Sequence, residues 1–140
     1  ARRVLIVTEL EHQQRTCRIA TTHFTWSADA QINEAQKADF SRLKSLLSRY
    51  PDYVLCGDFN APRGREMFGR FVDELGLMDH LPASVTSTID ARFHRAGELE
   101  LVVDTIFSTP EYRVTDVRVL EGISDHKGIL ARIERRIEPS

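Results

Sequence analysis

The chain has 140 residues, of which 41% are hydrophobic and 29% are charged, and its formal net charge is −2. This size and composition are typical of one globular domain with one core, and they argue against a disordered, collagen-like or coiled-coil chain. The longest apolar runs, such as residues 4–7, are far shorter than the ~20 residues that cross a bilayer, so no transmembrane segment is expected. The slight acidity gives no global attraction to a polyanion, so a nucleic-acid partner would need a local basic patch.

The first half of the chain predicts two strands, a helix and a third strand. Apolar, β-branched runs at residues 3–9 and 16–23 predict two strands joined by a hairpin loop over 11–15. Apolar side chains at helical spacing predict a helix over residues 29–50 with one buried stripe. The run at residues 53–57 is apolar throughout, which is typical of a strand covered on both faces.

The second half predicts one more helix and three strands. An amphipathic helix follows the loop at residues 58–64 and ends at Gly76, a residue type common at helix C-caps. Residues 81–97 are mixed and polar, which predicts a long surface connection. The remaining predicted strands are residues 99–107, 113–120 and 128–134. The order of elements predicts a layered α/β domain with two helices and a mixed sheet of five or six strands.

Polar residues that could carry chemistry follow the most apolar predicted strand. In an extended chain Asp58 and Asn60 point to the same side, and Gly57 allows another group to approach the backbone closely. The ordinary alternative is an Asx-type turn that starts the next helix. Both interpretations stay open on these residues alone.

Asp104 lies within the apolar run at residues 101–107. An ionised carboxylate is costly to bury, so in a covered strand it needs a cation, a histidine or several hydrogen-bond donors beside it. The alternative is an edge strand in which Asp104 faces water.

Two further groups stand next to predicted strands. His23 ends the second strand, close to the only tryptophan, Trp26; the ordinary interpretations are a core histidine and a core or pocket-rim tryptophan. Asp125 and His126 precede the last strand, where they would point to different sides or simply be surface residues. Because open α/β sheets place their sites at strand ends, the joint occurrence of all these groups favours one site.

The ordered motifs resemble the endonuclease/exonuclease/phosphatase superfamily over nearly the whole chain: His23-Phe24-Thr25-Trp26, Gly57-Asp58-Phe59-Asn60, Val103-Asp104-Thr105-Ile106-Phe107 and Ser124-Asp125-His126. The resemblance implies an α/β fold that is part of a four-layer sandwich, with a mixed β-sheet flanked by helices. It also implies that residues 1–140 form a single domain that is the C-terminal half of a longer one. In the family, the N-terminal half supplies a metal-binding Glu and an Asn near the phosphate. Neither has a counterpart here, since Glu9 is too close to His23 in the sequence.

The resemblance further implies hydrolysis of a phosphate ester by direct attack of water, dependent on a divalent metal ion. Asp58 would polarise or deprotonate the water, and Asn60 would orient it and hold a phosphate oxygen. His23 would support the phosphate or the leaving group. Such an enzyme would be a nuclease, a phosphodiesterase or a phosphatase.

The same resemblance implies roles for the remaining residues. Asp125 would ligate Mg²⁺ or Mn²⁺. His126 would contact the phosphate in its protonated form, and Asp104 would hold that imidazole. A metal ion and an imidazolium together would neutralise the charge that develops on the phosphoryl oxygens.

Substrate and partners stay open at this level. The substrate would be a phosphate ester in DNA, RNA, a phospholipid headgroup or an inositol phosphate. The polar residues Arg63, Arg65, Arg92, His94 and Arg95 would form either a phosphate-contacting patch or an ordinary solvated surface. The alternative to an enzyme is an inactive fragment that retains the fold and acts as a binding or assembly module.

Half of a two-sheet sandwich would expose the apolar inner face of its sheet. An apolar patch of that size drives association, so we expect self-association through this face. No targeting segment is visible in these residues, which makes the cytoplasm the default location. A targeting signal upstream in a longer protein stays open.

Overall fold

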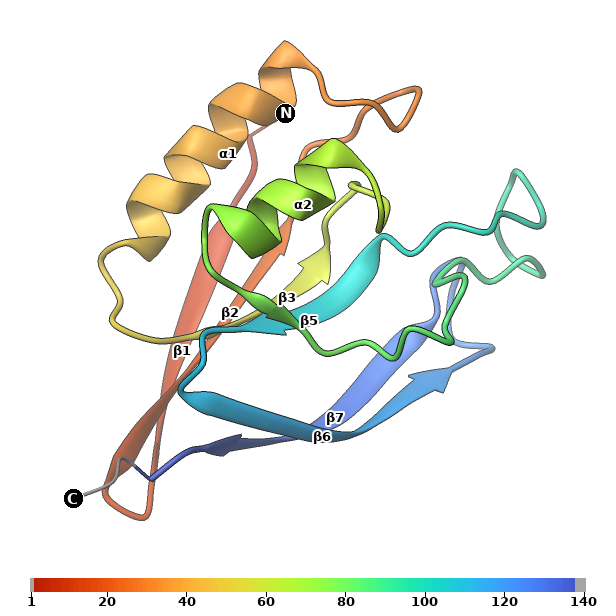
Figure 1. Ribbon diagram of the computed structural model, residues 1–140. Helices are drawn as coiled ribbons and strands as arrows, with labels where there is room; N and C mark the ends of the chain where they lie inside the picture. The colour runs from red at the N-terminus through yellow and green to blue at the C-terminus, as the bar shows by residue number, and fades with distance from the viewer. Residues whose placement is uncertain (1, 138–140) are drawn as a thin grey trace.

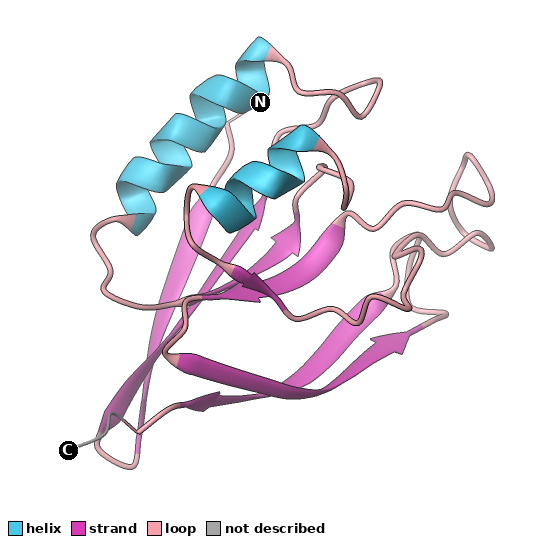
Figure 2. Ribbon diagram, in the orientation of Figure 1, coloured by secondary structure: helices cyan, strands magenta, loops and turns pink. Residues whose placement is uncertain are grey.

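A computed structural model describes residues 2–137 of the chain. Two helices cover one face of a five-stranded mixed sheet, and a two-stranded sheet packs on the other face, giving three layers (Figures 1 and 2). In the part of the chain that is described, no helix has the length and apolar character needed to cross a membrane. The elements in chain order are β1 (Leu5–His12), β2 (Arg15–His23), α1 (Glu34–Leu47), β3 (Val54–Asp58), α2 (Glu66–Asp73), β4 (Met78–Asp79), β5 (Asp104–Ser108), β6 (Tyr112–Leu120) and β7 (Gly128–Arg135).

The larger sheet has the strand order β1-β2-β3-β5-β4. β2 and β3 are parallel, and helix α1 makes the crossover between them, while the other neighbouring strands are antiparallel. The C-terminal ends of β2 and β3 therefore lie at the same edge of the sheet as the start of β5. The smaller sheet is the antiparallel hairpin β6-β7.

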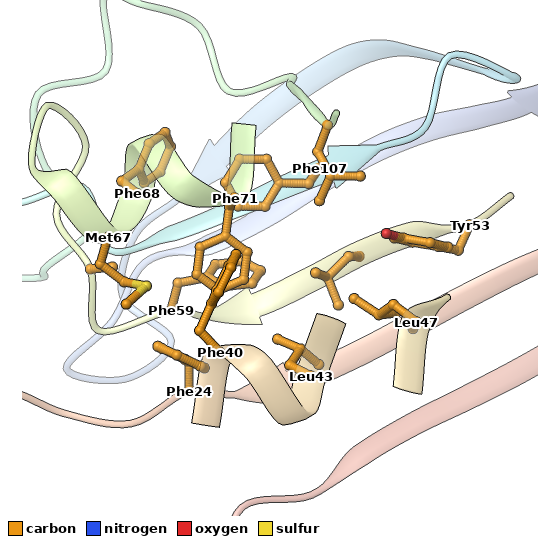
Figure 3. Close-up of a cluster of buried hydrophobic side chains, with 14 residues drawn as sticks. Phe24, Phe40, Leu43, Leu47, Tyr53, Phe59, Met67, Phe68, Phe71 and Phe107 are labelled. Atoms are coloured by element: carbon orange, nitrogen blue, oxygen red, sulfur yellow. The ribbon is translucent and has the colours of Figure 1, made fainter. Parts of the chain in front are cut away.

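The core between the helices and the sheet is built around Phe71 of α2. Its ring lies 5.0–5.7 Å, centroid to centroid, from four other phenylalanine rings, which come from both helical and sheet segments (Figure 3): Phe24, Phe40, Phe59 and Phe107. Phe59 is fully buried in this cluster, directly between Asp58 and Asn60. Packing of Phe59 in the core therefore fixes the position of the backbone at Asp58 and Asn60.

The face opposite the helices is only partly covered. Leu5 and Val7 pack toward the helices, whereas Leu10 pairs with Cys17, which packs toward the β6-β7 hairpin. Alternation along β1 therefore places Ile6 and Leu10 on the inner face, where they are 57% and 51% exposed. A groove of about 1050 Å³ lies between this end of β1-β2 and the hairpin. The inner apolar face that we expected is thus present.

Two predicted boundaries in the first half were wrong. The hairpin loop expected over residues 11–15 is a two-residue turn at Gln13 and Gln14, both with positive φ, and strand pairing continues to either side of it. Helix α1 begins at Glu34 rather than residue 29, because the side chain of Asn33 accepts a hydrogen bond from the backbone N–H of Gln36 and caps the helix.

Two predictions in the second half also need correction. The strand expected over residues 99–107 begins only at Asp104; the carbonyls of Val102 and Val103 instead accept hydrogen bonds from the backbone of Arg63 and Phe59 in the loop after β3. The short strand β4 was not predicted. The residues that the structure describes therefore form seven strands rather than the five or six expected.

Candidate active site

The strand register brings three predicted site residues together at the ends of neighbouring strands. His23 and Asp58, the last residues of β2 and β3, lie opposite each other. β5 runs antiparallel to β3, so its first residue, Asp104, also lies opposite Asp58. Figure 1 shows the loops after β2 and β3 and before β5 and β7 at one end of the molecule. The topology therefore places an imidazole and two carboxylates side by side.

Gly57 permits the close approach of β2 and β3 next to the site. Its φ is +145°, and a Cβ at this position would lie 2.0 Å from the carbonyl oxygen of Thr22. No residue with a side chain fits here unless the backbone moves. The close approach predicted at Gly57 is therefore made by the neighbouring strand.

The two carboxylate oxygens of Asp58 have different partners. Oδ1 accepts a 2.8 Å hydrogen bond from the backbone N–H of Asn60, which is the Asx turn given above as the alternative. Oδ2 faces two imidazoles, with Nε2 of His23 at 3.4 Å and Nε2 of His126 at 3.8 Å. The structural turn and the candidate site therefore share one carboxylate.

Asp104 has the histidine partner that its burial requires. Nδ1 of His126 lies 2.8 Å from Oδ2 of Asp104, whose side chain is 15% exposed. The alternative of an Asp104 that faces water is wrong, because its side chain is mostly buried and bonded to His126. With Nδ1 engaged by Asp104, the second ring nitrogen of His126 is left on the side of Asp58.

Burial and charge shift the pKa values of this pair. Burial raises the pKa of Asp104, and the hydrogen bond with His126 offsets this rise only in part. Burial by itself lowers the pKa of His126, but the hydrogen bond to Asp104 and the charges of Asp104, Asp58 and Asp125 raise it above the ordinary value of 6.5. The imidazole therefore keeps its proton to higher pH than a free histidine does.

Asn60 has a different local geometry from the one expected. Its φ is +46°, so the chain is not extended there and strand alternation does not direct its side chain. Nδ2 donates a 2.8 Å hydrogen bond to the carbonyl oxygen of Phe24, and the backbone carbonyl accepts one of 3.3 Å from the buried side chain of Gln36. Asn60 thus connects the loops that follow β2 and β3.

The remaining predicted residues are exposed. The side chain of His23 is 66% exposed and Trp26 is 61% exposed, so the core interpretation of both is wrong. Asp125 is also exposed and close enough for its charge to act on His126. The structure therefore brings His23, Asp58, Asp104 and His126 together, with Asp125 at their margin.

Two buried polar residues of the long connection support this site, and the sequence analysis missed both. The hydroxyl oxygen of Thr88, which is fully buried, accepts a 3.2 Å hydrogen bond from the backbone N–H of Asp104 and fixes the start of β5. Asp90 is 3% exposed and accepts a 2.8 Å hydrogen bond from the backbone N–H of Gly122. Neither belongs to a periodic run, so no pattern marks them in the sequence.

Asp90 joins two loops at the site. Its carboxylate also binds the guanidinium of Arg92 through bonds of 2.9 and 3.0 Å, and its backbone N–H donates to the carbonyl of Asp125 at 2.9 Å. These bonds hold the pKa of Asp90 well below its usual range. The connection that carries Arg92 and the loop that carries His126 are therefore fastened together. His94 follows, with its ring centroid 6.4 Å from that of His126.

The arginines of the predicted basic patch are partly ion-paired within the protein and partly exposed. Arg63 forms a 3.0 Å ion pair with Asp79, and Arg92 forms one of 2.9 Å with Asp90. Their charges are therefore largely neutralised within the protein, while Arg65 and Arg95 are exposed.

The donor set at the sheet edge suits a hard divalent cation. One ligand atom from each of Asp58, Asp104 and His126 lies within 4.8 Å of the others. Carboxylate oxygens are the ligands that Mg²⁺ and Mn²⁺ prefer. An ion that took Nδ1 of His126 would displace its hydrogen bond to Asp104.

Comparison with known proteins identifies the fold. No protein-family model and no curated protein matches the sequence. An endonuclease/exonuclease/phosphatase from Beutenbergia cavernae DSM 12333 matches with a TM-score of 0.71 and 18% identity, over 96% of this chain and 40% of the other. The human Nocturnin catalytic domain with bound sulfate anion matches with a TM-score of 0.66 and 21% identity, over 96% and 52%. The mannosyl-6-phosphatase of Bacteroides thetaiotaomicron VPI-5482 gives 0.59 and 18%, over 87% and 52%.

The chain therefore has the α/β fold of the endonuclease/exonuclease/phosphatase family. It spans about half the length of these solved structures. The fold class predicted from the ordered motifs is confirmed.

Proposed function

We propose that this chain carries catalytic groups for the hydrolysis of a phosphate ester by water, dependent on Mg²⁺ or Mn²⁺. The observation that carries the proposal is the 2.8 Å contact between Asp104 and His126, with Asp58 facing the other ring nitrogen of His126. An imidazole held by one carboxylate, with a second carboxylate beside it, can present a proton and a base to the same reacting phosphate.

The proposed roles follow from these positions. Asp104 holds Nδ1 of His126 and favours its charged form, so Nε2 can donate a hydrogen bond to a phosphoryl oxygen as negative charge develops there. Oδ2 of Asp58 accepts the proton of the attacking water. His23, 3.4 Å from Oδ2 of Asp58 and largely exposed, faces the side from which the phosphate or leaving group enters. Nδ2 of Asn60 donates one hydrogen to the carbonyl of Phe24, and we propose that its second hydrogen contacts a phosphate oxygen.

We assign the metal ion to Asp125. No hydrogen bond or ion pair between described residues engages its carboxylate, and it directly precedes His126 in the same loop. A bound divalent ion would supply Lewis-acid stabilisation of the phosphoryl oxygens. His126 and Asp104 stay hydrogen-bonded in this assignment, so the imidazole remains available to the phosphate.

The chain is further proposed to be the C-terminal portion of a longer domain. It spans about half the length of the solved structures it matches, and one face of its larger sheet is partly uncovered. The additional residues would complete the metal site and cover that face. The substrate is a phosphate ester, with nucleic acid among the candidates.

A hydrolysis panel tests this function. The 140-residue chain is incubated with Mg²⁺ and plasmid DNA, an abasic duplex, a small phosphodiester or a phosphomonoester, with and without a chelator. We expect Mg²⁺-dependent hydrolysis of one of these that is lost in Asp58→Asn and kept in Asp73→Asn, a matched change on the exposed end of α2. Hydrolysis that survives Asp58→Asn or the chelator would overturn the proposal. Inactivity of every form would favour either a catalytic fragment that needs the additional residues or the binding-module alternative.

A further inference from the structure

We propose that Gln36 of helix α1 is a positioning residue for the reaction, because it holds Asn60 in the orientation that presents its amide to a phosphate oxygen. This inference rests on the proposed phosphoesterase function and adds to it a residue outside the two loops that carry His23 and Asn60. Gln36 is 1% exposed, so a substrate cannot reach its side chain. Any effect of Gln36 on the reaction must therefore act through the residues that it contacts.

Gln36 occupies a helix position at which an apolar side chain is expected. The buried residues of α1 lie at the spacing of one helical face: Gln36, Phe40, Leu43 and Leu47. The other three belong to the hydrophobic core around Phe71. An amide in such a face loses its hydrogen bonds to water, which is costly unless the protein supplies partners. The partners of Gln36 therefore indicate what this polar side chain does in the core.

The side-chain nitrogen of Gln36 binds the two loops that carry site residues. Nε2 donates a 2.8 Å hydrogen bond to the carbonyl of Thr25, in the loop after β2, and one of 3.3 Å to the carbonyl of Asn60, in the loop after β3. Nδ2 of Asn60 in turn donates a 2.8 Å hydrogen bond to the carbonyl of Phe24, the residue before Thr25. These three bonds close a ring through both loops, and Gln36 is the member that comes from the helical layer.

Asn60 needs this support because its backbone adopts a less favourable conformation. Its φ of +46° lies in the left-handed region, which asparagine adopts more easily than most residues but not without cost. Oδ1 of Asp58 binds its backbone N–H at 2.8 Å, and Gln36 binds its carbonyl. The direction of a side chain depends on the backbone that carries it, so a rotation at Asn60 would redirect its amide. Gln36 therefore helps to set the direction of that amide.

Loss of this support should lower the rate of the reaction more than the binding of substrate. The amide of Asn60 is assigned to a phosphate oxygen that gains charge in the transition state, and such a contact contributes mainly to kcat. Gln36→Met keeps the length of the side chain and removes both hydrogen bonds. We expect its kcat to fall roughly ten- to hundredfold, as for a group displaced by about 1 Å, with KM changed less than about threefold. Gln31→Met, at an exposed position before the same helix, is the matched control.

A double-mutant cycle separates positioning from structural support. Asn60→Gly removes the amide and accommodates the positive φ at this residue. Because Gln36 acts through Asn60 in this proposal, Gln36→Met should lower kcat less than about threefold when Asn60→Gly is already present. A purely structural role would reduce the fraction of folded molecules and lower the rate by the same factor in both backgrounds. Equal factors would overturn the inference.

The sole tryptophan, Trp26, supplies a second measurement that needs no hydrolysis. The carbonyl of Thr25 that Gln36 binds belongs to the peptide group joining Thr25 to Trp26. Gln36→Met should free this peptide group and lower the steady-state fluorescence anisotropy of Trp26, measured without substrate on samples that circular dichroism shows to be folded. Gln31→Met should keep the anisotropy of the unmodified chain. Unchanged anisotropy in Gln36→Met would overturn the inference.

The two measurements distinguish failure of this inference from failure of the proposed function. Hydrolysis by the unmodified chain with full kcat in Gln36→Met would support the function and overturn only the role of Gln36. Lowered anisotropy in Gln36→Met together with a negative hydrolysis panel would support the hold of Gln36 on the loops and count against the reaction. If Gln36→Met does not fold, Gln36→Asn replaces it in both measurements, because its amide is one methylene shorter and cannot reach both carbonyls.

Discussion

The imidazole of His126 and the carboxylate of Asp104 are joined by a 2.8 Å hydrogen bond between two segments that are far apart in the sequence. The contact ties the loop before β7 to the first residue of β5. It connects the two sheets at the edge where the other candidate catalytic groups lie, so both the protonation state of the site and its assembly depend on it.

This pair predicts the pH dependence of hydrolysis. Because the pKa of His126 is raised above 6.5, the active imidazolium should persist through neutral pH, and kcat/KM should fall as pH rises through that raised value. Asp104→Asn removes the charge that raises the pKa, so the alkaline decline should move to lower pH. The exposed Asp116→Asn is the control. An alkaline limb that stays in place in Asp104→Asn would contradict the assigned role of His126.

The shared carboxylate of Asp58 predicts that two variants separate activity from stability. Asp58→Asn keeps an oxygen that can accept the N–H of Asn60, whereas Asp58→Ala loses that turn and about 1 kcal/mol of unfolding free energy. Both should lack hydrolysis. Chemical denaturation and the hydrolysis assay measure the two effects, and equal destabilisation by both variants would argue against the turn.

The packing around Gly57 predicts that even a methyl group cannot be accommodated at this position. Gly57→Ala would place Cβ against the carbonyl of Thr22 and should cost more than ~3 kcal/mol or prevent folding. Gly64→Ala is the matched control, because its φ is also positive at +88° but its surroundings are open, and it should cost only ~1–2 kcal/mol. Similar unfolding free energies for the two variants would contradict the close approach.

Removal of the Asp90 carboxylate should loosen the connection around Phe93. Asp90→Ala loses the bonds to Arg92 and Gly122, so trypsin should cleave after Arg92 and Arg95 faster than in the unmodified chain. Asp116→Ala, an exposed residue in the β6-β7 hairpin, should leave the cleavage rate unchanged. Cleavage that is no faster in Asp90→Ala would show that other contacts hold this segment.

The exposed inner face predicts self-association of the isolated chain. Light scattering should report oligomers whose mass rises with concentration, and Ile6→Lys or Leu10→Lys should shift them toward monomers. Leu130→Lys is the control: Leu130 is 54% exposed but lies between Ile129 and Ala131, which pack inward, and so points away from the groove. A stable monomer of the unmodified chain would refute the prediction.

The proximity of the candidate residues was easier to predict than the boundaries of the strands. Asp104 stood out because a carboxylate in an apolar run needs a partner, and its partner proved to be His126, one of the few nearby candidates of suitable chemistry. By contrast, Gln13 and Gln14 adopt positive φ without the Asn or Gly that usually marks such a turn. Residues 99–103 have the composition of a strand, but their backbone groups form hydrogen bonds with loops. Those loops are distant in the sequence, so local composition does not reveal these bonds.

The two residues that support the site could not be predicted from local sequence patterns. Thr88 and Asp90 act through backbone groups of Asp104 and Gly122, and such contacts depend on the folded arrangement rather than on spacing. Gln36 of α1 was missed for the same reason. Its polar side chain is buried because it donates hydrogen bonds to backbone carbonyls of two loops.

The double use of Asp58 also affects how relatives of this chain should be judged. A descendant that lost the chemistry would still need an acceptor for the turn at this position, so Asp or Asn would persist there without selection for turnover. The side chains of Asp104 and His126 bond to each other rather than to a turn of the backbone, so the loss of one removes the partner of the other. Their joint retention or joint loss is therefore the more informative mark of whether a related sequence still catalyses a reaction.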